Sequence, residues 1–184
     1  DYEKRMDMIE LREELGKSIR EGFSGFSLYY QPQIRQSNYQ IFGAEALLRY
    51  HSVERGDISP EKFISILEQT GMIIPVGEWV LRTALAQCKK WREKLPDFHI
   101  SVNVSYVQMR NKGIMGMVLD LLQKAELPGD CLTLEMTESM QLQDYRYFNR
   151  IFYTWRKHGI EISIDDFGTG YSSLGYLKSL EINE

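Results

Sequence analysis

The stretch His-Ile-Ser-Val-Asn-Val-Ser at residues 99–105 shows the pattern that decides the fold. Side chains on a β-strand alternate between two faces, so Ser101, Asn103 and Ser105 share one face and the apolar residues share the other. In an open parallel sheet, helices cover both faces and both are apolar. In a barrel, every second side chain points to the interior, where a small polar face can line the lumen. This stretch therefore favours a barrel strand over a strand of an open sheet.

Two later segments repeat the alternation. One places Glu135 between two threonines on its polar face, and the other places Asp165 there beside a serine. Glu135 follows Asn103 by 32 positions, and Asp165 follows Glu135 by 30. Each interval accommodates a strand and an amphipathic crossover helix, so the spacing predicts parallel βα units.

The apolar periodicity predicts the other elements. Residues 1–20 are typical of an amphipathic helix, and a polar loop at residues 35–38 joins two strands into a hairpin. A helix begins at Pro60 with Ser59 as its N-cap, and Gly71 ends it. The expected strands are residues 26–34, 39–50, 99–105, 132–138 and 161–166, and the later helices are residues 80–91, 114–125, 145–158 and 170–180.

These elements predict an α/β fold of the TIM-like (β/α)₈ barrel type, with a doubly wound open sheet as the alternative. A complete barrel takes about 200 residues or more, and residues 180–184 resemble the start of one more strand. We therefore expect an incomplete barrel. Residues 1–22 would form an N-terminal linker helix, and residues 23–184 one domain truncated before its last strands and helices.

Composition excludes some classes of function. The formal net charge is -4, which lacks the basic excess expected of a protein that binds a DNA duplex by charge. No apolar run approaches the roughly 20 residues that span a bilayer, so we expect no membrane contact by this segment, although the parent protein could be membrane-anchored. Cys88 and Cys131 show no metal-binding spacing, and we expect buried free thiols in a reducing, cytoplasmic compartment.

Five side chains with oxygen donors lie at similar places in the predicted strands. Alone, each has a structural explanation: a buried Glu usually pairs with Lys or Arg, an Asn bonds the backbone, and Asp-Asp caps a helix. Together they predict a site for Mg²⁺, Mn²⁺ or Ca²⁺, because hard cations prefer oxygen and offset buried carboxylate charge. The five are Glu45, Asn103, Glu135, Asp165 and Asp166.

The adjacent Asp165 and Asp166 indicate a pair of cations. Neighbouring residues on a regular strand face opposite ways, so the strand must end or bend there for both carboxylates to reach one site. One could then bridge two cations about 3.5–4 Å apart, the usual device for hydrolysing phosphate esters. Arg49 shares a strand face with Glu45 and Leu47, where its guanidinium could hold a phosphate.

This joint pattern resembles the EAL domain family, the cyclic-di-GMP phosphodiesterases. The resemblance covers nearly the whole chain, and its motifs come in the family's order and spacing. They are Tyr30-Gln31-Pro32, Glu45-Ala46-Leu47 followed by Arg49, Ser101 to Ser105, Glu135-Met136-Thr137-Glu138, and the specific segment Asp165-Asp166-Phe167-Gly168-Thr169-Gly170-Tyr171-Ser172-Ser173-Leu174.

The resemblance implies a barrel whose first strand is antiparallel to the rest, which suits the predicted hairpin. It implies hydrolysis of cyclic di-GMP to linear pGpG with two Mg²⁺ or Mn²⁺ ions. By motif, the metal ligands would be Glu45, Asn103, Glu135 and a shared Asp165, with Asp166 on the second ion. Of these, Glu45, Asp165 and Asp166 would be the catalytic residues.

The resemblance also implies contacts outside the metal site. Gln31, Leu47 and Arg49 would contact the dinucleotide. Glu138 would anchor the loop that begins at Phe167 and Gly168, which in this family supports metal binding and dimerisation. We therefore expect a homodimer, with the leading helix joining the domain to an upstream GGDEF or sensory domain.

The family's next motif, Lys-Ile-Asp, would begin about where the given sequence stops, and its Lys orients or activates the attacking water. Asn183 stands where an Asp is common. We expect activity in the complete domain. One alternative is an EAL domain that binds cyclic di-GMP or a protein partner without catalysis. Another is a different barrel enzyme with oxygen-ligated metals, such as one acting on enolates.

Overall fold

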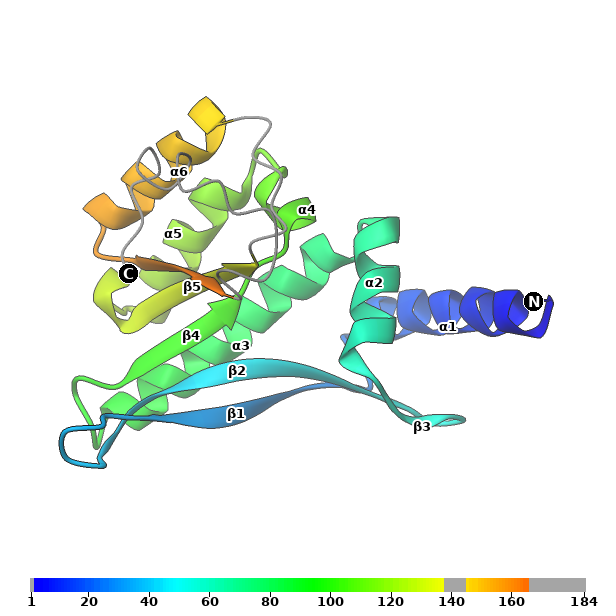
Figure 1. Cartoon of the computed structure of the whole chain (residues 1–184), viewed down its shortest axis with the longest axis horizontal. Helices are drawn as coiled ribbons and strands as arrows, with labels where there is room; N and C mark the ends of the chain where they lie inside the picture. The colour runs from blue at the N-terminus through cyan, green and yellow to red at the C-terminus, as the bar shows by residue number, and fades with distance from the viewer. Residues whose placement is uncertain (1, 138–144, 166–184) are drawn as a thin grey trace.

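The computed structural model describes residues 2–137 and 145–165, which form one sheet with helices packed beside it (Figure 1). The helices are α1 (Tyr2–Arg20), α2 (Pro60–Thr70), α3 (Ile73–Arg92), α4 (Tyr106–Met109), α5 (Ile114–Ala125) and α6 (Tyr145–Lys157). The strands are β1 (Phe26–Ile34), β2 (Ile41–Ser52), β3 (Gly56–Ile58), β4 (His99–Asn103), β5 (Leu132–Thr137) and β6 (Glu161–Asp165).

The sheet has the topology that the sequence predicted. Its strand order is β1-β2-β4-β5-β6, and β3 pairs with the end of β2. Strands β1 and β2 form an antiparallel hairpin, with Gln31 opposite Glu45. Strands β2, β4, β5 and β6 are parallel neighbours, joined by helical crossovers. The carboxyl ends of these four strands therefore lie along one edge of the sheet.

The two faces of the parallel strands differ as the alternation predicted. One face carries apolar side chains that are buried under helices: α3 contacts β4, α6 contacts β6, and α5 contacts both of these helices. The other face carries the small polar and acidic residues. The buried apolar residues are Ala44, Ala46, Ile100, Val102, Leu132, Leu134, Met136 and Ile162.

Local signals explain where α2 begins and ends. Gly71 adopts the left-handed conformation, with φ of 74°, and its N–H donates to the carbonyl of Glu68, as expected of a helix-ending glycine. Ser59 is the N-cap residue of α2 as predicted, but its side chain makes no capping hydrogen bond. Its carbonyl accepts from the N–H groups of Lys62 and Phe63. Pro60, whose φ is fixed for the first helical position, begins the helix without a side-chain hydrogen bond from Ser59.

The strand predicted over residues 99–105 is shorter. It ends at Asn103, because Ser105 caps α4. The Ser105 hydroxyl accepts from the N–H of Gln108 at 3.4 Å, and the Gln108 side chain accepts from the N–H of Ser105 at 2.9 Å. This Ser-x-x-Gln capping box was present in the sequence and could have predicted α4.

Other boundaries also moved. Strand β2 covers Ile41–Ser52 rather than residues 39–50, and the three-residue β3 was not predicted. The helix predicted at residues 170–180 and the strand start at residues 180–184 lie outside the described residues. Dividing the chain into a linker over residues 1–22 and a domain over residues 23–184 stays a prediction. Both cysteines are buried free thiols, as expected, and none of the described helices could cross a bilayer.

Candidate metal and phosphodiester site

The predicted ligands from the first three parallel strands lie together on the polar face. The side-chain amide of Asn103 on β4 donates from Nδ2 to Oε1 of Glu45 on β2, at 2.8 Å. The Cα of Glu135 on β5 is the register partner of Asn103 on the opposite side of β4. The sheet therefore aligns one amide and two carboxylates across three neighbouring strands.

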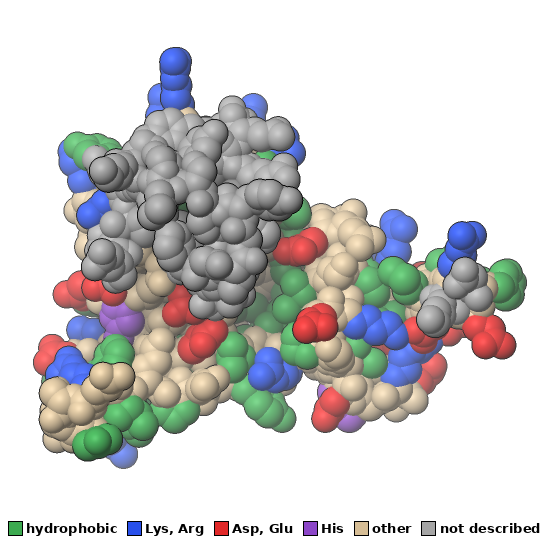
Figure 2. All heavy atoms as spheres, in the orientation of Figure 1, with side chains coloured by type: hydrophobic (Ala, Val, Ile, Leu, Met, Phe, Trp, Pro, Cys, Tyr) green, Lys and Arg blue, Asp and Glu red, His purple; other side chains and the backbone are tan. Residues whose placement is uncertain are grey.

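These side chains are more open to solvent than expected. Glu45 and Glu135 are half-buried and Asn103 is exposed, whereas the sequence suggested carboxylates buried at strand ends. The difference arises because the apolar side chains, not the polar ones, pack under the helices. Figure 2 shows acidic side chains on the sheet face turned towards the viewer.

Of the other residues predicted for the metal site and its supporting loop, the structure describes only Asp165. Asp165 is the last residue of β6, and its backbone pairs with Thr137 on β5, so the next strand also ends at this edge. Asp166, Phe167, Gly168 and Glu138 lie outside the described residues. Their predicted roles as ligand and loop support stay predictions.

The described donors fit a hard cation in their chemistry. Glu45, Asn103 and Glu135 provide oxygen donors alone, which suits Mg²⁺ or Mn²⁺. Among the side chains that the structure describes, no three His, Cys, Asp or Glu residues lie close enough together to hold a metal ion. The carboxylates of Asp165 and Asp166 would have to complete the predicted pair of sites.

The residues predicted to contact the dinucleotide share this face. Gln31 on β1 is exposed and lies opposite Glu45, and Leu47 and Arg49 are half-buried on β2. Arg49 donates from Nη1 to the carbonyl of Leu48 at 2.9 Å, and its guanidinium lies 5.5 Å from the centre of the Tyr29 ring. Attraction between a cation and an aromatic face favours this arrangement.

Tyr29 was missed as a site residue. Strand alternation places it on the face of Gln31, and the hairpin places it opposite Leu47, next to Arg49. Both signals were present in the sequence. An open hollow of about 620 Å³ borders this end of the site, lined by residues that include Ser27, Tyr29, Arg49 and His51. The Nδ1 atom of His51 lies 2.7 Å from Oδ1 of Asp57 at its rim.

A second polar layer lies below the predicted ligands, towards the amino ends of the strands. The side chain of Gln33 donates to the hydroxyl of Ser101 at 3.1 Å. His99 contacts the hydroxyl of Thr133, which donates to the carboxylate of Glu161 at 3.2 Å. Burial lowers the pKa of His99, and the nearby Glu161 carboxylate partly opposes that shift. This layer fills the polar face beneath the site with hydrogen-bonded groups.

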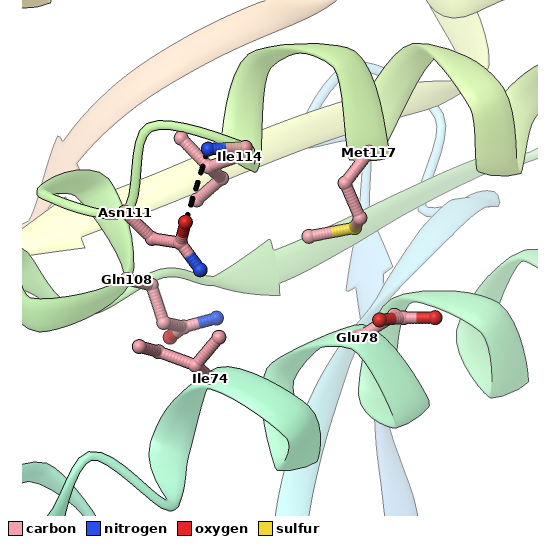
Figure 3. Close-up of a pocket in the computed structure, with 7 residues that line it drawn as sticks. Ile74, Glu78, Gln108, Asn111, Ile114 and Met117 are labelled. Atoms are coloured by element: carbon pink, nitrogen blue, oxygen red, sulfur yellow. Dashed lines mark hydrogen bonds between the residues drawn. The ribbon is translucent and has the colours of Figure 1, made fainter.

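A smaller depression of about 210 Å³ lies in the helical layer, between α3 on one side and α4 and α5 on the other (Figure 3). Asn111 and Gln108 lie along one wall, and Asn111 accepts a hydrogen bond from the N–H of Gly113 at 3.0 Å. A Cβ atom at Gly77 of α3 would lie 1.9 Å from Nε2 of Gln108, so a larger residue there would have to displace the Gln108 side chain. Residues of α3, α4, α5 and the turn between α4 and α5 line this depression, away from the polar sheet face.

A comparison with protein families agrees with these features of the sheet, namely its aligned polar groups, antiparallel first strand and parallel units. The EAL domain model matches residues 12–184. The chain belongs to the EAL domain family. The described sheet is accordingly the first part of a TIM-like barrel, as predicted from its strand faces, and not a doubly wound open sheet.

Two relatives of this EAL domain are named as cyclic di-GMP phosphodiesterases. It is 40% identical over 158 residues to the bifunctional diguanylate cyclase/cyclic di-GMP phosphodiesterase MucR of Pseudomonas aeruginosa, covering 85% of this chain and 23% of MucR. It is 34% identical over 156 residues to the cyclic di-GMP phosphodiesterase PdeR of Escherichia coli, covering 85% of this chain and 23% of PdeR. The chain thus spans about a quarter of the length of these relatives.

A solved structure is also similar. The MucR phosphodiesterase, determined as a complex with cyclic di-GMP, superposes on this EAL domain with a TM-score of 0.87 at 38% identity. The match covers 95% of this chain and 70% of that one. At 38% identity the two proteins are related in sequence as well as in fold.

Proposed function

We propose that this EAL domain, in its complete form, is a metal-dependent phosphodiesterase that hydrolyses cyclic di-GMP to linear pGpG. The observation that carries the proposal is the contact between Glu45 and Asn103 on the polar face, with Glu135 next in register. Relatives named as cyclic di-GMP phosphodiesterases support the substrate. The oxygen-only donor set supports Mg²⁺ or Mn²⁺ as the cofactor.

In this proposal Glu45, Asn103, Glu135 and Asp165 would hold two cations, with Asp165 shared and Asp166 on the second. Such ions lower the pKa of a bound water and stabilise the leaving oxygen of a phosphodiester. The hydrogen bond from Asn103 would orient the Glu45 carboxylate before substrate arrives. Gln31 and Leu47 would contact the dinucleotide, and Arg49 would pair its guanidinium with a phosphate.

The partners of the whole protein are part of the same proposal. Glu138 would anchor the loop containing Phe167 and Gly168, and this loop would support a homodimer. An upstream GGDEF or sensory domain would precede α1, which agrees with the small share of each relative that the chain spans. The two buried free thiols suit a cytoplasmic location.

The test is hydrolysis by the full-length protein. We expect Glu45→Ala to lower pGpG production by at least about 100-fold, because loss of a ligand weakens the cation site that activates water. Chromatography of cyclic di-GMP and pGpG, with Mg²⁺ or Mn²⁺ present, measures the effect. Glu61→Ala, which removes an exposed carboxylate of α2, is the matched control and should retain activity.

Two outcomes would change the assignment. Near-normal pGpG production by Glu45→Ala would overturn the proposed role of Glu45 and the site built around it. Tight binding of cyclic di-GMP by the wild-type protein without any pGpG, under either metal, would support the non-catalytic receptor instead.

A further inference from the structure

Arg55 ties α1 to the far end of β2. It lies in the turn between β2 and β3, and its guanidinium faces three carboxylates on one side of α1. Its Nε lies 3.3 Å from Asp7, its Nη2 lies 2.6 Å from Glu10, and its Nη1 lies 3.7 Å from Glu14. We call these four residues the Arg55 cluster. The Arg55 side chain is only 20% exposed, so this is not an ordinary surface pair.

A second cation extends the cluster to α2. Nζ of Lys62 lies 2.5 Å from Oδ2 of Asp7, while Arg55 contacts Oδ1 of the same carboxylate. The hydrogen bonds from Lys62 and Arg55 hold the pKa of Asp7 below its usual range. Figure 2 shows acidic and basic side chains intermingled over α1 and the elements beside it. Networked charges of this kind contribute more than isolated surface pairs.

Tyr50 forms the second attachment of α1, inside the protein. This buried tyrosine of β2 donates its hydroxyl hydrogen to Glu14 at 3.2 Å and shares another hydrogen bond with Ser18 at 2.9 Å. Its ring packs against Phe26 and Phe63, with centroids at 4.7 Å and 5.9 Å. Glu14 therefore contacts both Arg55 and Tyr50, and it links the two attachments.

A third attachment lies between the end of α1 and the start of β1, at Gly25. The carbonyl of Gly25, just before β1, accepts from the N–H of His51 at 2.9 Å. Gly25 has a φ of 81°, and a Cβ atom there would lie 2.6 Å from the carbonyl oxygen of His51. Only glycine suits both this conformation and this close approach. The residue before β1 is thus held directly against β2, and residues 21–24 connect it to the end of α1.

All three attachments hold the part of the chain that follows Arg49 on β2. Tyr50 and His51 directly follow Arg49, and Ser27 of β1 is the register partner of Arg49. Tyr50 points to the helical side while Arg49 points to the site, as strand alternation requires. The ring of Tyr29, which the guanidinium of Arg49 approaches, belongs to the same β1 strand that α1 leads into.

We propose that α1 positions Arg49 for the dinucleotide, by holding the end of β2 through the Arg55 cluster, Tyr50 and Gly25. Arg55 and Tyr50 are positioning residues, since they would act on Arg49 through the backbone of β2 and would not contact the substrate. The proposal rests on the proposed function only for the identity of the ligand. Displacement of α1 would loosen this end of β2 and weaken dinucleotide binding without altering the cation ligands.

The first test needs no substrate. In the full-length protein we expect Arg55→Glu to raise hydrogen exchange of the backbone amides at residues 48–52 by about 5-fold or more, because released attachments permit local opening. Glu13→Lys is the matched control, since Glu13 is an exposed residue of α1 without an ion pair among the described contacts, and should leave that exchange unchanged.

The second test measures the substrate. We expect Arg55→Glu to raise the KM for cyclic di-GMP by about 5- to 20-fold, at the lower end of the usual coupling between sites, while kcat changes less than about twofold. Adding Glu10→Lys to Arg55→Glu restores the 2.6 Å ion pair with its charges exchanged and leaves the pair of Lys62 with Asp7 in place, so it should return KM part of the way to the wild-type value. A role in stability alone would not separate KM from kcat in this way.

Unchanged exchange at residues 48–52 in folded Arg55→Glu would overturn the proposal, whatever the enzyme does. Changed exchange with an unchanged KM would also overturn it, since Arg49 would then not depend on α1. If Arg55→Glu fails to fold, Glu10→Gln gives the same two measurements with one ion pair removed. Faster exchange in a protein that binds no cyclic di-GMP would refute the proposed substrate and leave the mechanical link intact.

Discussion

The two faces of the parallel sheet are built from the same strands yet obey different requirements. On β4, Ile100 and Val102 are almost completely buried, while Asn103 is exposed and hydrogen-bonded to Glu45. Neighbouring residues in the chain thus belong to the core and to the site. The apolar face is specified by volume and burial, and the polar face by the identity and orientation of single groups.

This difference teaches how the fold separates stability from chemistry. Each strand fixes its backbone by burying one side, which leaves the opposite side chains free to be chosen for function. Substitutions on the apolar face should therefore reduce stability, and those on the polar face should reduce binding with little cost to stability.

The largest expected effect tests the apolar face. Ile100→Ala should lower the free energy of unfolding by about 3 kcal/mol, through lost burial and the cavity left behind. Urea unfolding followed by circular dichroism measures it. Ile100→Val, the matched control, should cost about 1 kcal/mol. Equal losses in the two variants would contradict tight packing between β4 and its helices.

An intermediate effect on stability is expected at His99, in the polar layer beneath the site. His99 lies on the polar face, yet its protonation should affect the free energy of unfolding. Since burial lowers the pKa of His99, the unfolded chain takes up this proton at a higher pH than the folded protein does. Stability should therefore fall as pH drops below about 6.5, the ordinary histidine pKa. Unfolding of wild type and His99→Gln between pH 8 and pH 5 measures this, and identical pH profiles would count against it.

The smallest effect on stability is expected at the exposed end of the same strand. Asn103→Ala should change the free energy of unfolding by less than about 1 kcal/mol, because only one hydrogen bond in a solvent-accessible place is lost. Binding of Mn²⁺, followed by calorimetry, should nevertheless weaken by about 10-fold or more. A large stability loss with unchanged cation binding would reverse the comparison between the two faces.

Strand pattern was enough to predict the sheet. The alternation around Asn103 and Glu135, and the regular spacing of the units, predicted parallel strands with one polar face, and the loop after Ile34 predicted the antiparallel hairpin. Strand ends were harder, because Ser105 continues the polar alternation while its side chain serves as a helix cap. Two local preferences competed there, and the capping box won.

The candidate site was predicted as a set of residues but not as an arrangement. Sequence placed Glu45, Asn103 and Glu135 on one face, yet it gave no sign that Asn103 donates to Glu45, because that contact depends on the stagger between strands. The Arg55 cluster was equally hidden. Its partners lie more than forty positions apart in the chain, and only the docking of α1 brings them together.

The antiparallel hairpin also has a consequence for how the molecule assembles. Strands β1 and β2 are joined by the short loop of residues 35–40, whereas β3 and the helices α2 and α3 lie between β2 and β4 in the chain. Closing a short loop costs less chain entropy and is faster than closing a long one. The hairpin can thus form first and offer the free edge of β2 as a template for β4, which would give the barrel a defined starting point in time.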